Sequence, residues 1–276
     1  MPANAKVSTV ARPSPQQKVR KQQWFPPQHG AWAFIGLPIA LGIVVAPWTP
    51  LLALTSICAI AAFPLSHFLT AIIRYPNKTR YVKPLILWAA LSLPLALAVL
   101  IARPWLIWFG AFYLIALSLN IALARNKLER SLANDVIFIV ECVALTPIMW
   151  AIGSGTGALA PTASNLSLAP ASLWVTTFLA FLVLVDSTLH VKSLIRERNN
   201  PRYRTASRVW SIFSLIAAFL LAALAGWPAF VIAIPFGYLI ARCYLLNGKD
   251  LKPGVLGIVE LGAILLLFAA VIVSGG

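Results

Sequence analysis

Residues 171–191 read ASLWVTTFLAFLVLVDSTLHV, and residues 192–204 continue as KSLIRERNNPRYR. The first stretch is apolar and long enough to cross a hydrocarbon core of ~30 Å as a helix. The second stretch is short and rich in Lys and Arg, which short cytoplasmic loops retain. Together they predict a membrane span whose C-terminal end faces the cytoplasm.

The same pattern recurs along the whole chain. Apolar segments with short connections cover residues 30–48, 50–73, 84–102, 104–124, 133–153, 171–191, 207–225, 227–246 and 254–274. These segments predict an all-α, polytopic membrane protein with nine transmembrane helices. Residues 24–276 then form one membrane domain, and residues 1–23 are expected to be a disordered, basic cytoplasmic tail.

The positions of the cations predict the orientation. Of the 22 Lys and Arg residues, 21 lie in the tail or follow spans 2, 4, 6 and 8, and only Arg103 falls on the other side. Three of the cations surround the connection after span 8, namely Arg242, Lys249 and Lys252. We interpret most of the 22 cations as orienting charges, and their distribution predicts a cytoplasmic N-terminus and an external C-terminus.

Composition supports a membrane protein and excludes other classes. The chain is 60% hydrophobic with a mean hydropathy of +0.86. Its net charge of +15 is explained by the loops, so we expect contact with anionic lipid and no nucleic-acid partner. The three cysteines have no paired spacing, which gives neither a disulfide framework nor a zinc motif.

Ionisable residues within the spans are candidates for function because burying them in hydrocarbon is costly. They gather in the cytoplasmic half, which indicates a cavity open to the cytoplasm. We expect His67, Asp186 and His190 to share this space. The candidate binding residues are His29, His67, Arg74, Arg80, Asp135, Glu141, Lys192, Arg196 and Arg198.

Span 6 contains the candidate catalytic residues Asp186, His190 and Glu197. With Ser193 they recur on one face of a helix that is expected to continue to Arg198. A carboxylate one turn from a histidine can fix its tautomer and raise its basicity. The alternative is a local pair that only satisfies two buried polar groups.

Span 5 contains two further carboxylates. Ser131 and Asp135 can be explained as a helix N-cap and a first-turn charge. Glu141 lies about two turns deeper, where a carboxylate needs either a partner from another span or a proton.

The ends of spans 2 and 6 are weakly similar. Residues 67–74 and residues 190–196 both run from His to Arg through a polar residue and an apolar trio, and a basic turn with Pro and Asn follows each. Chance similarity is one explanation. The other is a duplicated bundle in which spans 2 and 6 are equivalent.

Three stretches resemble the YwiC-like family of bacterial membrane proteins. They are PPQHGAW at 26–32, ERSLAND at 129–135 and VKSLIRER at 191–198. This resemblance covers about residues 24–274 and implies a location in the bacterial inner membrane.

The architecture is also similar to that of the UbiA-type prenyltransferases, which have nine spans in a duplicated bundle. In that family, aspartates after spans 2 and 6 hold Mg²⁺ and a prenyl diphosphate. Here residues 67–83 contain no Asp or Glu, and His190 stands where a second aspartate is expected. A magnesium clamp is therefore incomplete. Basic residues near both motifs can still bind a phosphate-like group directly, namely Arg74, Lys78, Arg80, Arg196 and Arg198.

Three functional hypotheses follow. The first is a protein that binds or processes an amphipathic, polyprenyl- or lipid-like anion. The second is a transporter or a non-catalytic accessory factor, for example of a respiratory complex. The third is a metal or haem site built from His29, His67 and His190. The residues do not decide whether the chain is an enzyme, and they specify neither a cofactor nor a protein partner.

Overall fold

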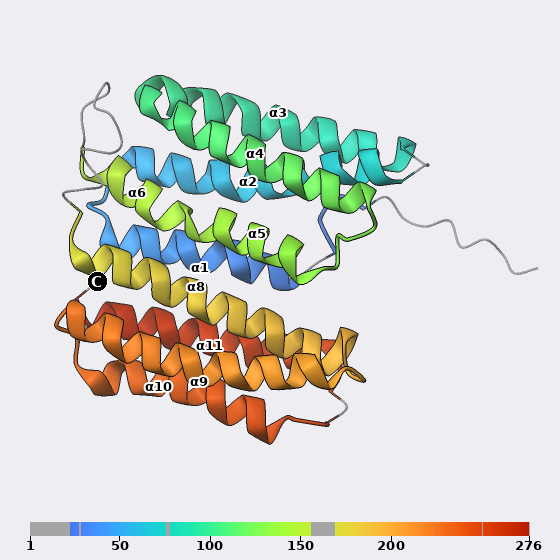
Figure 1. The fold of residues 1–276 in the computed structure, drawn as a ribbon. Helices are drawn as coiled ribbons and strands as arrows, with labels where there is room; N and C mark the ends of the chain where they lie inside the picture. Colours follow the sequence, from blue (N-terminus) through green and yellow to red (C-terminus); the bar gives the residue numbers. More distant parts are fainter. Residues whose placement is uncertain (1–22, 28, 76–77, 156–168, 250, 276) are drawn as a thin grey trace, which may run out of the picture.

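The computed structural model describes residues 23–27, 29–75, 78–155, 169–249 and 251–275. Its described elements are all helical, which confirms the all-α part of the predicted fold class for these residues (Figure 1). They are α1 (His29–Val45), α2 (Pro50–Arg74), α3 (Thr79–Ala102), η1 (Pro104–Leu106), α4 (Ile107–Arg125), α5 (Leu132–Val143), α6 (Leu145–Gly153), α8 (Ala171–Val191), η2 (Lys192–Arg196), α9 (Pro201–Leu224), α10 (Ala229–Leu245) and α11 (Pro253–Val273). The predicted tail lies outside the described residues, apart from Gln23.

The described helices correspond to the predicted segments in order. Seven stretches are long and apolar enough to cross a membrane. Two further apolar helices, α1 and α10, are shorter, at 17 residues each. A helix of 17 residues is at the lower limit for spanning a bilayer. The chain is therefore a multi-pass membrane protein.

The segment predicted as one span at 133–153 contains a break. It is divided into α5 and α6 at Ala144. Pro147 explains the break, because proline has no amide hydrogen to donate to the carbonyl of Val143 and its ring clashes with the preceding turn.

The helix of span 6 also ends differently from the prediction. The α-helix stops at Val191, and Lys192–Arg196 form one turn of π-helix. The amide of Glu197 then donates to the carbonyl of Lys192 at 2.8 Å. The helical segment thus ends at Arg196, two residues before the expected end, and Asn200 caps the next helix ahead of Pro201.

Helix α8 lies at the centre of the bundle (Figure 1). In the span that contains it, 72% of the most apolar window is buried, compared with 11% for α3 and 6% for the span of η1 and α4. Its apolar side chains pack with residues of α1, α5, α9, α10 and α11 in one core cluster. The outer helices α3 and α4 therefore present most of their surface to lipid.

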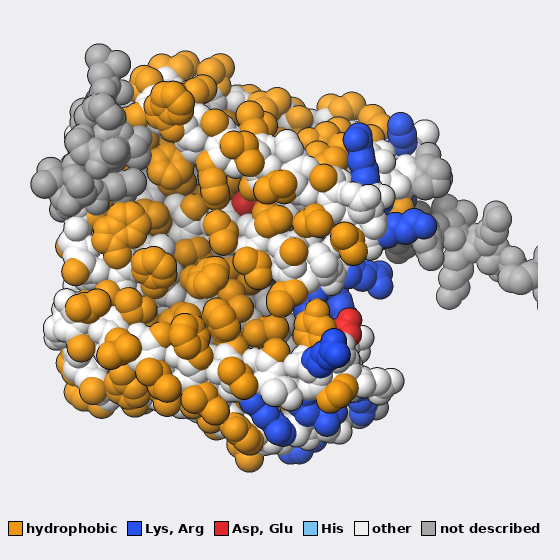
Figure 2. Space-filling view, viewed as in Figure 1, with side chains coloured by type: hydrophobic (Ala, Val, Ile, Leu, Met, Phe, Trp, Pro, Cys, Tyr) orange, Lys and Arg blue, Asp and Glu red, His pale blue; other side chains and the backbone are white. Residues whose placement is uncertain are grey.

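Apart from Arg103, the described Lys and Arg residues gather toward one end of the bundle, where a wide apolar surface ends (Figure 2). This end contains the connections α2–α3, α4–α5, α8–α9 and α10–α11. Arg103 follows α3 and lies at the opposite end. The cations that follow alternate spans in the sequence therefore lie together in space, and we call this end of the bundle the basic end.

Candidate functional site

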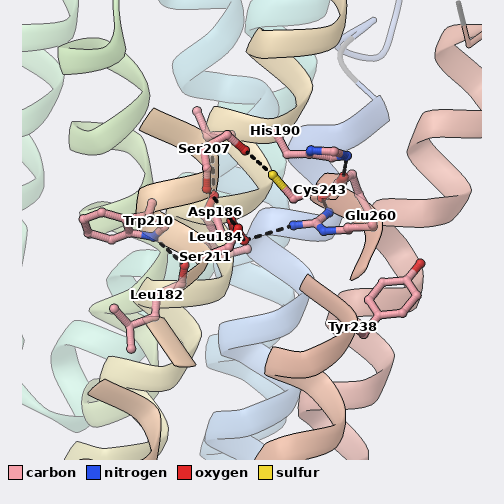
Figure 3. A network of polar contacts seen from close by, with 12 residues as sticks. Leu182, Leu184, Asp186, His190, Ser207, Trp210, Ser211, Tyr238, Cys243 and Glu260 are labelled. Carbon is pink, nitrogen blue, oxygen red and sulfur yellow. Dashed lines mark hydrogen bonds and ion pairs between the residues drawn. The ribbon is translucent and has the colours of Figure 1, made fainter. Parts of the chain in front are cut away.

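Helix α8 places Asp186 and His190 one turn apart in the protein interior. Asp186 is 0% exposed and His190 is 1% exposed. The hydroxyl of Ser211, from α9, donates to Asp186 at 2.6 Å to Oδ1 and 3.0 Å to Oδ2. Figure 3 shows this contact and the direction in which the two α8 side chains point.

Arg242 brings a positive charge into the same interior. It lies in the last turn of α10 and is 3% exposed. Its Nη2 is 3.5 Å from Asp186 Oδ2, and its Nη1 forms an ion pair with Glu260 of α11. One guanidinium thus bridges two carboxylates from different helices, which is the compensation that a buried charge requires.

His190 completes the group, which we call the buried charge cluster: Asp186, His190, Arg242 and Glu260. His190 Nε2 lies 4.0 Å from Glu260 Oε1, which is too long for a hydrogen bond. Neither ring nitrogen has a hydrogen-bond partner among the described residues. The π-helix begins two residues further on, and such turns are frequent at functional sites.

Small polar residues of α9 allow the helices around the cluster to approach. Ser207, Ser211 and Ser214 recur along one face of α9 and are at most 1% exposed. Ser207 Oγ contacts Cys243 Sγ of α10 at 3.5 Å. Small side chains let helix backbones come close in membranes. Helix α9 therefore lies close enough to α8 for the hydroxyl of Ser211 to reach Asp186.

A second polar contact joins the two halves of the chain at the basic end. Lys192, in the π-helix, forms an ion pair with Asp135 at 2.7 Å and donates to the carbonyl of Arg130 at 2.5 Å. Ser131 caps α5 by accepting from the amide of Asn134 at 3.3 Å. The capping interpretation is therefore confirmed, and Asp135 has in addition a partner in η2.

A third feature is a cavity of about 310 Å³ at the basic end. We call it the head-group cavity. It is lined by Gln23, Pro27, His67, Ala71, Tyr75, Arg80 and Tyr81. They come from the end of α2, the start of α3 and the segment before α1. Arg80 Nη2 donates to Gln23 Oε1 at 3.2 Å, which orients the guanidinium.

Aromatic rings form part of the cavity wall. Tyr75 and Tyr81 stack with ring centroids 5.6 Å apart. Arg74 lies over the ring of Tyr75 at 4.9 Å and forms an ion pair with Glu129. The described lining contains no Asp or Glu, and its polar side chains include one guanidinium, one imidazole and two phenol groups.

Glu141 has the partner on another helix that its depth requires. Asn120 Nδ2, on α4, lies 3.2 Å from Oε2 and 3.4 Å from Oε1 of Glu141. The hydroxyl of Tyr113 donates to the carbonyl of Glu141 at 2.9 Å. Glu141 is thus half-buried beside α4 and belongs to neither the cavity nor the buried charge cluster.

The expectation that His67, Asp186 and His190 share one space is wrong for this structure. His67 lines the head-group cavity, whereas the two α8 residues lie in the buried charge cluster. Helices α1 and α6 pack between α2 and α8, which separates the two places (Figure 1).

The expected face of Asp186, His190 and Glu197 is also interrupted. The π-turn changes the helical phase after Val191, and Glu197 accepts from Asn200 Nδ2 at 3.2 Å outside the cluster. Arg196 and Arg198 are exposed at the basic end. His29 begins α1, and its side chain lies outside the described part of the structure.

Sequence reasoning missed Arg242 and Ser211. Arg242 was interpreted as an orienting charge, but it is buried between two carboxylates. The available signal was its position within an apolar helix, before the turn at Gly248, rather than in the connection itself. Ser211 carried no comparable signal, since serine is common in membrane helices.

His67 and His190 do not share a metal site in the described part of the chain, and the side chain of His29 lies outside it. No group of three or more His, Cys, Asp or Glu residues there has an arrangement that could hold a metal ion. His67 and His190 belong to the separate features described above.

The fold and the buried charges define a polytopic helical membrane protein with polar features at one end. The chain belongs to the YwiC-like family: residues 25–150 match the model of the YwiC-like protein. It is 30% identical over 246 residues to the protein named "Uncharacterized protein YwiC" of Bacillus subtilis, covering 86% of this chain and 91% of that protein.

A second relative, from Haemophilus influenzae, carries the name "Uncharacterized protein". It is 30% identical over 185 residues, which cover 65% of this chain and 70% of the relative. No solved structure matches the chain.

Proposed function

We propose that this protein binds the anionic head group of a membrane amphiphile in the head-group cavity. The observation that carries the proposal is the lining itself, in which Arg80 and His67 lie near two tyrosines and which has no Asp or Glu among the described residues. Arginine suits phosphate and carboxylate groups because its planar donors can bind two oxygens at once.

The surroundings of the cavity suit the apolar part of such a ligand. Helix α3 continues from Arg80 and Tyr81 into the bilayer and exposes large apolar side chains, among them Ile86 and Leu93. A head group in the cavity can therefore be joined to a tail that lies along α3 in the hydrocarbon. The ligand class is a polyprenyl- or lipid-like anion.

The proposal includes an orientation and a fold relationship. The basic end faces the cytoplasm of the bacterial inner membrane, and all nine helical segments cross the bilayer, with α5 and α6 forming one of them. The bundle has a duplicated, UbiA-like organisation. The duplicated organisation is supported by the histidine that α2 and α8 each have about two turns before the basic end.

A transporter is the second candidate function, and one observation favours it. Asp186, Arg242 and Glu260 are ionisable residues buried between membrane helices. Buried ionisable groups of this kind mark ion and proton pathways in membrane proteins. A carrier would release the amphiphile on the opposite side of the membrane, whereas a binding protein or an enzyme would not.

The cavity can be tested with Arg80→Gln and Lys83→Gln. Lys83 lies on the same helix and is exposed, so its replacement removes the same charge outside the cavity. With farnesyl diphosphate as the probe, in nanodiscs of zwitterionic lipid, we expect Arg80→Gln to weaken binding about tenfold or more, because it removes a charge-assisted contact. Lys83→Gln should change binding little.

The probe is compared with farnesol and with inorganic diphosphate, which carry only the tail or only the head group. Both should bind more weakly than farnesyl diphosphate. Chelation of Mg²⁺ should leave binding in place, since the segment after α2 has no carboxylate to hold the ion. Equal losses in the two variants, or binding that disappears on chelation, would exclude the proposed site.

A further inference from the structure

We propose that the buried charge cluster of Asp186, His190, Arg242 and Glu260 is a site that takes up and releases one proton. The inference goes beyond the proposed binding function, because it rests on helices α8, α10 and α11 and not on the head-group cavity. The ligand class is the proton itself, exchanged with water.

The charges of the cluster support the proposal. With both carboxylates ionised and His190 neutral, the four side chains carry one net negative charge. They come from three helices and are at most 7% exposed. An uncompensated charge at such a place is costly. One added proton makes the cluster neutral, on either a carboxyl group or the imidazole ring.

His190 provides a place for this proton. Both ring nitrogens are buried and have no hydrogen-bond partner in the described part of the chain. Nε2 is 4.0 Å from Glu260 Oε1, so a protonated ring would face a carboxylate. Glu260 already contacts Arg242 through its other oxygen, and it can therefore interact with both cations at once.

Other charged or titratable groups near these helices have partners of their own. In η2, directly after α8, Lys192 pairs with Asp135, and on α5, Glu141 contacts Asn120. Among the others, Tyr238 donates to the carbonyl of Val259, Cys243 contacts Ser207, and Arg208 lies over the ring of Tyr244. Residues 30–45 of α1 include no titratable side chain. Within the described residues, no further ion pair balances the cluster.

The position of the cluster indicates the side of exchange. His190 is next to the last residue of α8, and Arg242 lies in the last turn of α10. Glu260 is seven residues from the start of α11, which is about 10 Å along a helix. These helix ends all lie at the basic end, so we expect the proton to exchange with water there.

The test is a pH-difference infrared spectrum of the full-length protein in lipid nanodiscs, recorded between about pH 8 and pH 5, where histidine titrates. We expect histidine-ring or carboxylic-acid bands that correspond to one proton and that disappear in Glu260→Gln, because this variant leaves the cluster neutral. His190→Gln keeps the net negative charge and should lose only a histidine-ring band. His67→Gln is the matched control, and it should retain these bands.

Asp186→Asn is the sharpest variant. It keeps both His190 and Glu260 but removes one negative charge, so the cluster is neutral without an added proton. The bands should disappear from this range although both expected proton carriers are present. A thermal unfolding measurement shows whether Glu260→Gln folds. If it does not, Asp186→Asn alone serves as the test.

Three results would overturn the proposal. Glu260→Gln and Asp186→Asn could both give the same bands as the wild-type protein. Asp186→Asn could retain bands that Glu260→Gln loses. Sodium added at constant pH could produce the same difference spectrum, which would indicate a metal-cation site. Asp186→Asn should also leave farnesyl diphosphate binding unchanged. The proposal of a proton site and the proposal of a head-group cavity can therefore be tested independently of each other.

Discussion

Arg242→Gln is expected to destabilise the protein more than the loss of any exposed cation. The substitution leaves Asp186 and Glu260 buried together without the guanidinium that contacts both of them. Breaking a buried ion pair by removing one partner costs about 3–5 kcal/mol. For a chain of this size, the melting temperature should fall by roughly 10 °C, which thermal unfolding in mild detergent measures.

Two further variants show whether charge is the reason. Lys249→Gln removes an exposed cation just beyond the same helix and should have almost no effect, as surface charges contribute little. In the double variant Arg242→Gln with Glu260→Gln, part of the lost stability should return, because only one carboxylate stays buried. Equal melting temperatures for Arg242→Gln and Lys249→Gln would contradict the buried network.

The orientation predicts an all-or-none result. A reporter that is active only in the cytoplasm should be active when it is inserted near residue 200, between α8 and α9, and inactive when it is fused after residue 276. The reason is that short loops rich in Lys and Arg are generally retained in the cytoplasm. The measurement is reporter activity in intact bacterial cells.

A reporter with the opposite properties, active only outside the cytoplasm, is the control for expression. It should give the reverse pattern at the same two positions. Activity of the cytoplasmic reporter at residue 276, or its silence near residue 200, would contradict the proposed nine crossings.

The helices and the basic end could be predicted because both depend on patterns that are local in sequence. A run such as residues 171–191 is long and apolar, and its length alone indicates a span. The partner that Glu141 needs was also predictable in kind, since a carboxylate at that depth must be compensated. Its identity, Asn120, was not predictable from the sequence, because it depends on how α4 packs against α5.

The candidate site was predicted in part for the same reason. Asp186 and His190 could be found from their spacing on one helix. Arg242 joins them through the packing of α8, α10 and α11, which the sequence does not encode locally. The π-turn after Val191 had no sequence signal that we used, and it is this turn that moves Glu197 away from the predicted face.

The two polar features lie in different halves of the chain, and one contact at the basic end links them. The pair of Lys192 and Asp135 connects the end of α8 to the start of α5. Lys192 directly follows the helix that carries His190. The helix that carries Asp186 and His190 of the buried charge cluster is therefore connected, through this ion pair, to the half of the chain that contains the head-group cavity.

Native mass spectrometry of the protein released from its own membranes tests the central claim most directly. We expect the wild-type chain to retain one bound anionic amphiphile, with a mass that contains both a phosphate-like or carboxylate head group and an apolar tail. Arg80→Gln should lose this species, and Lys83→Gln should keep it. A wild-type chain without any bound amphiphile, or the same species on Arg80→Gln in undiminished amount, would contradict the claim that the head-group cavity is the binding site.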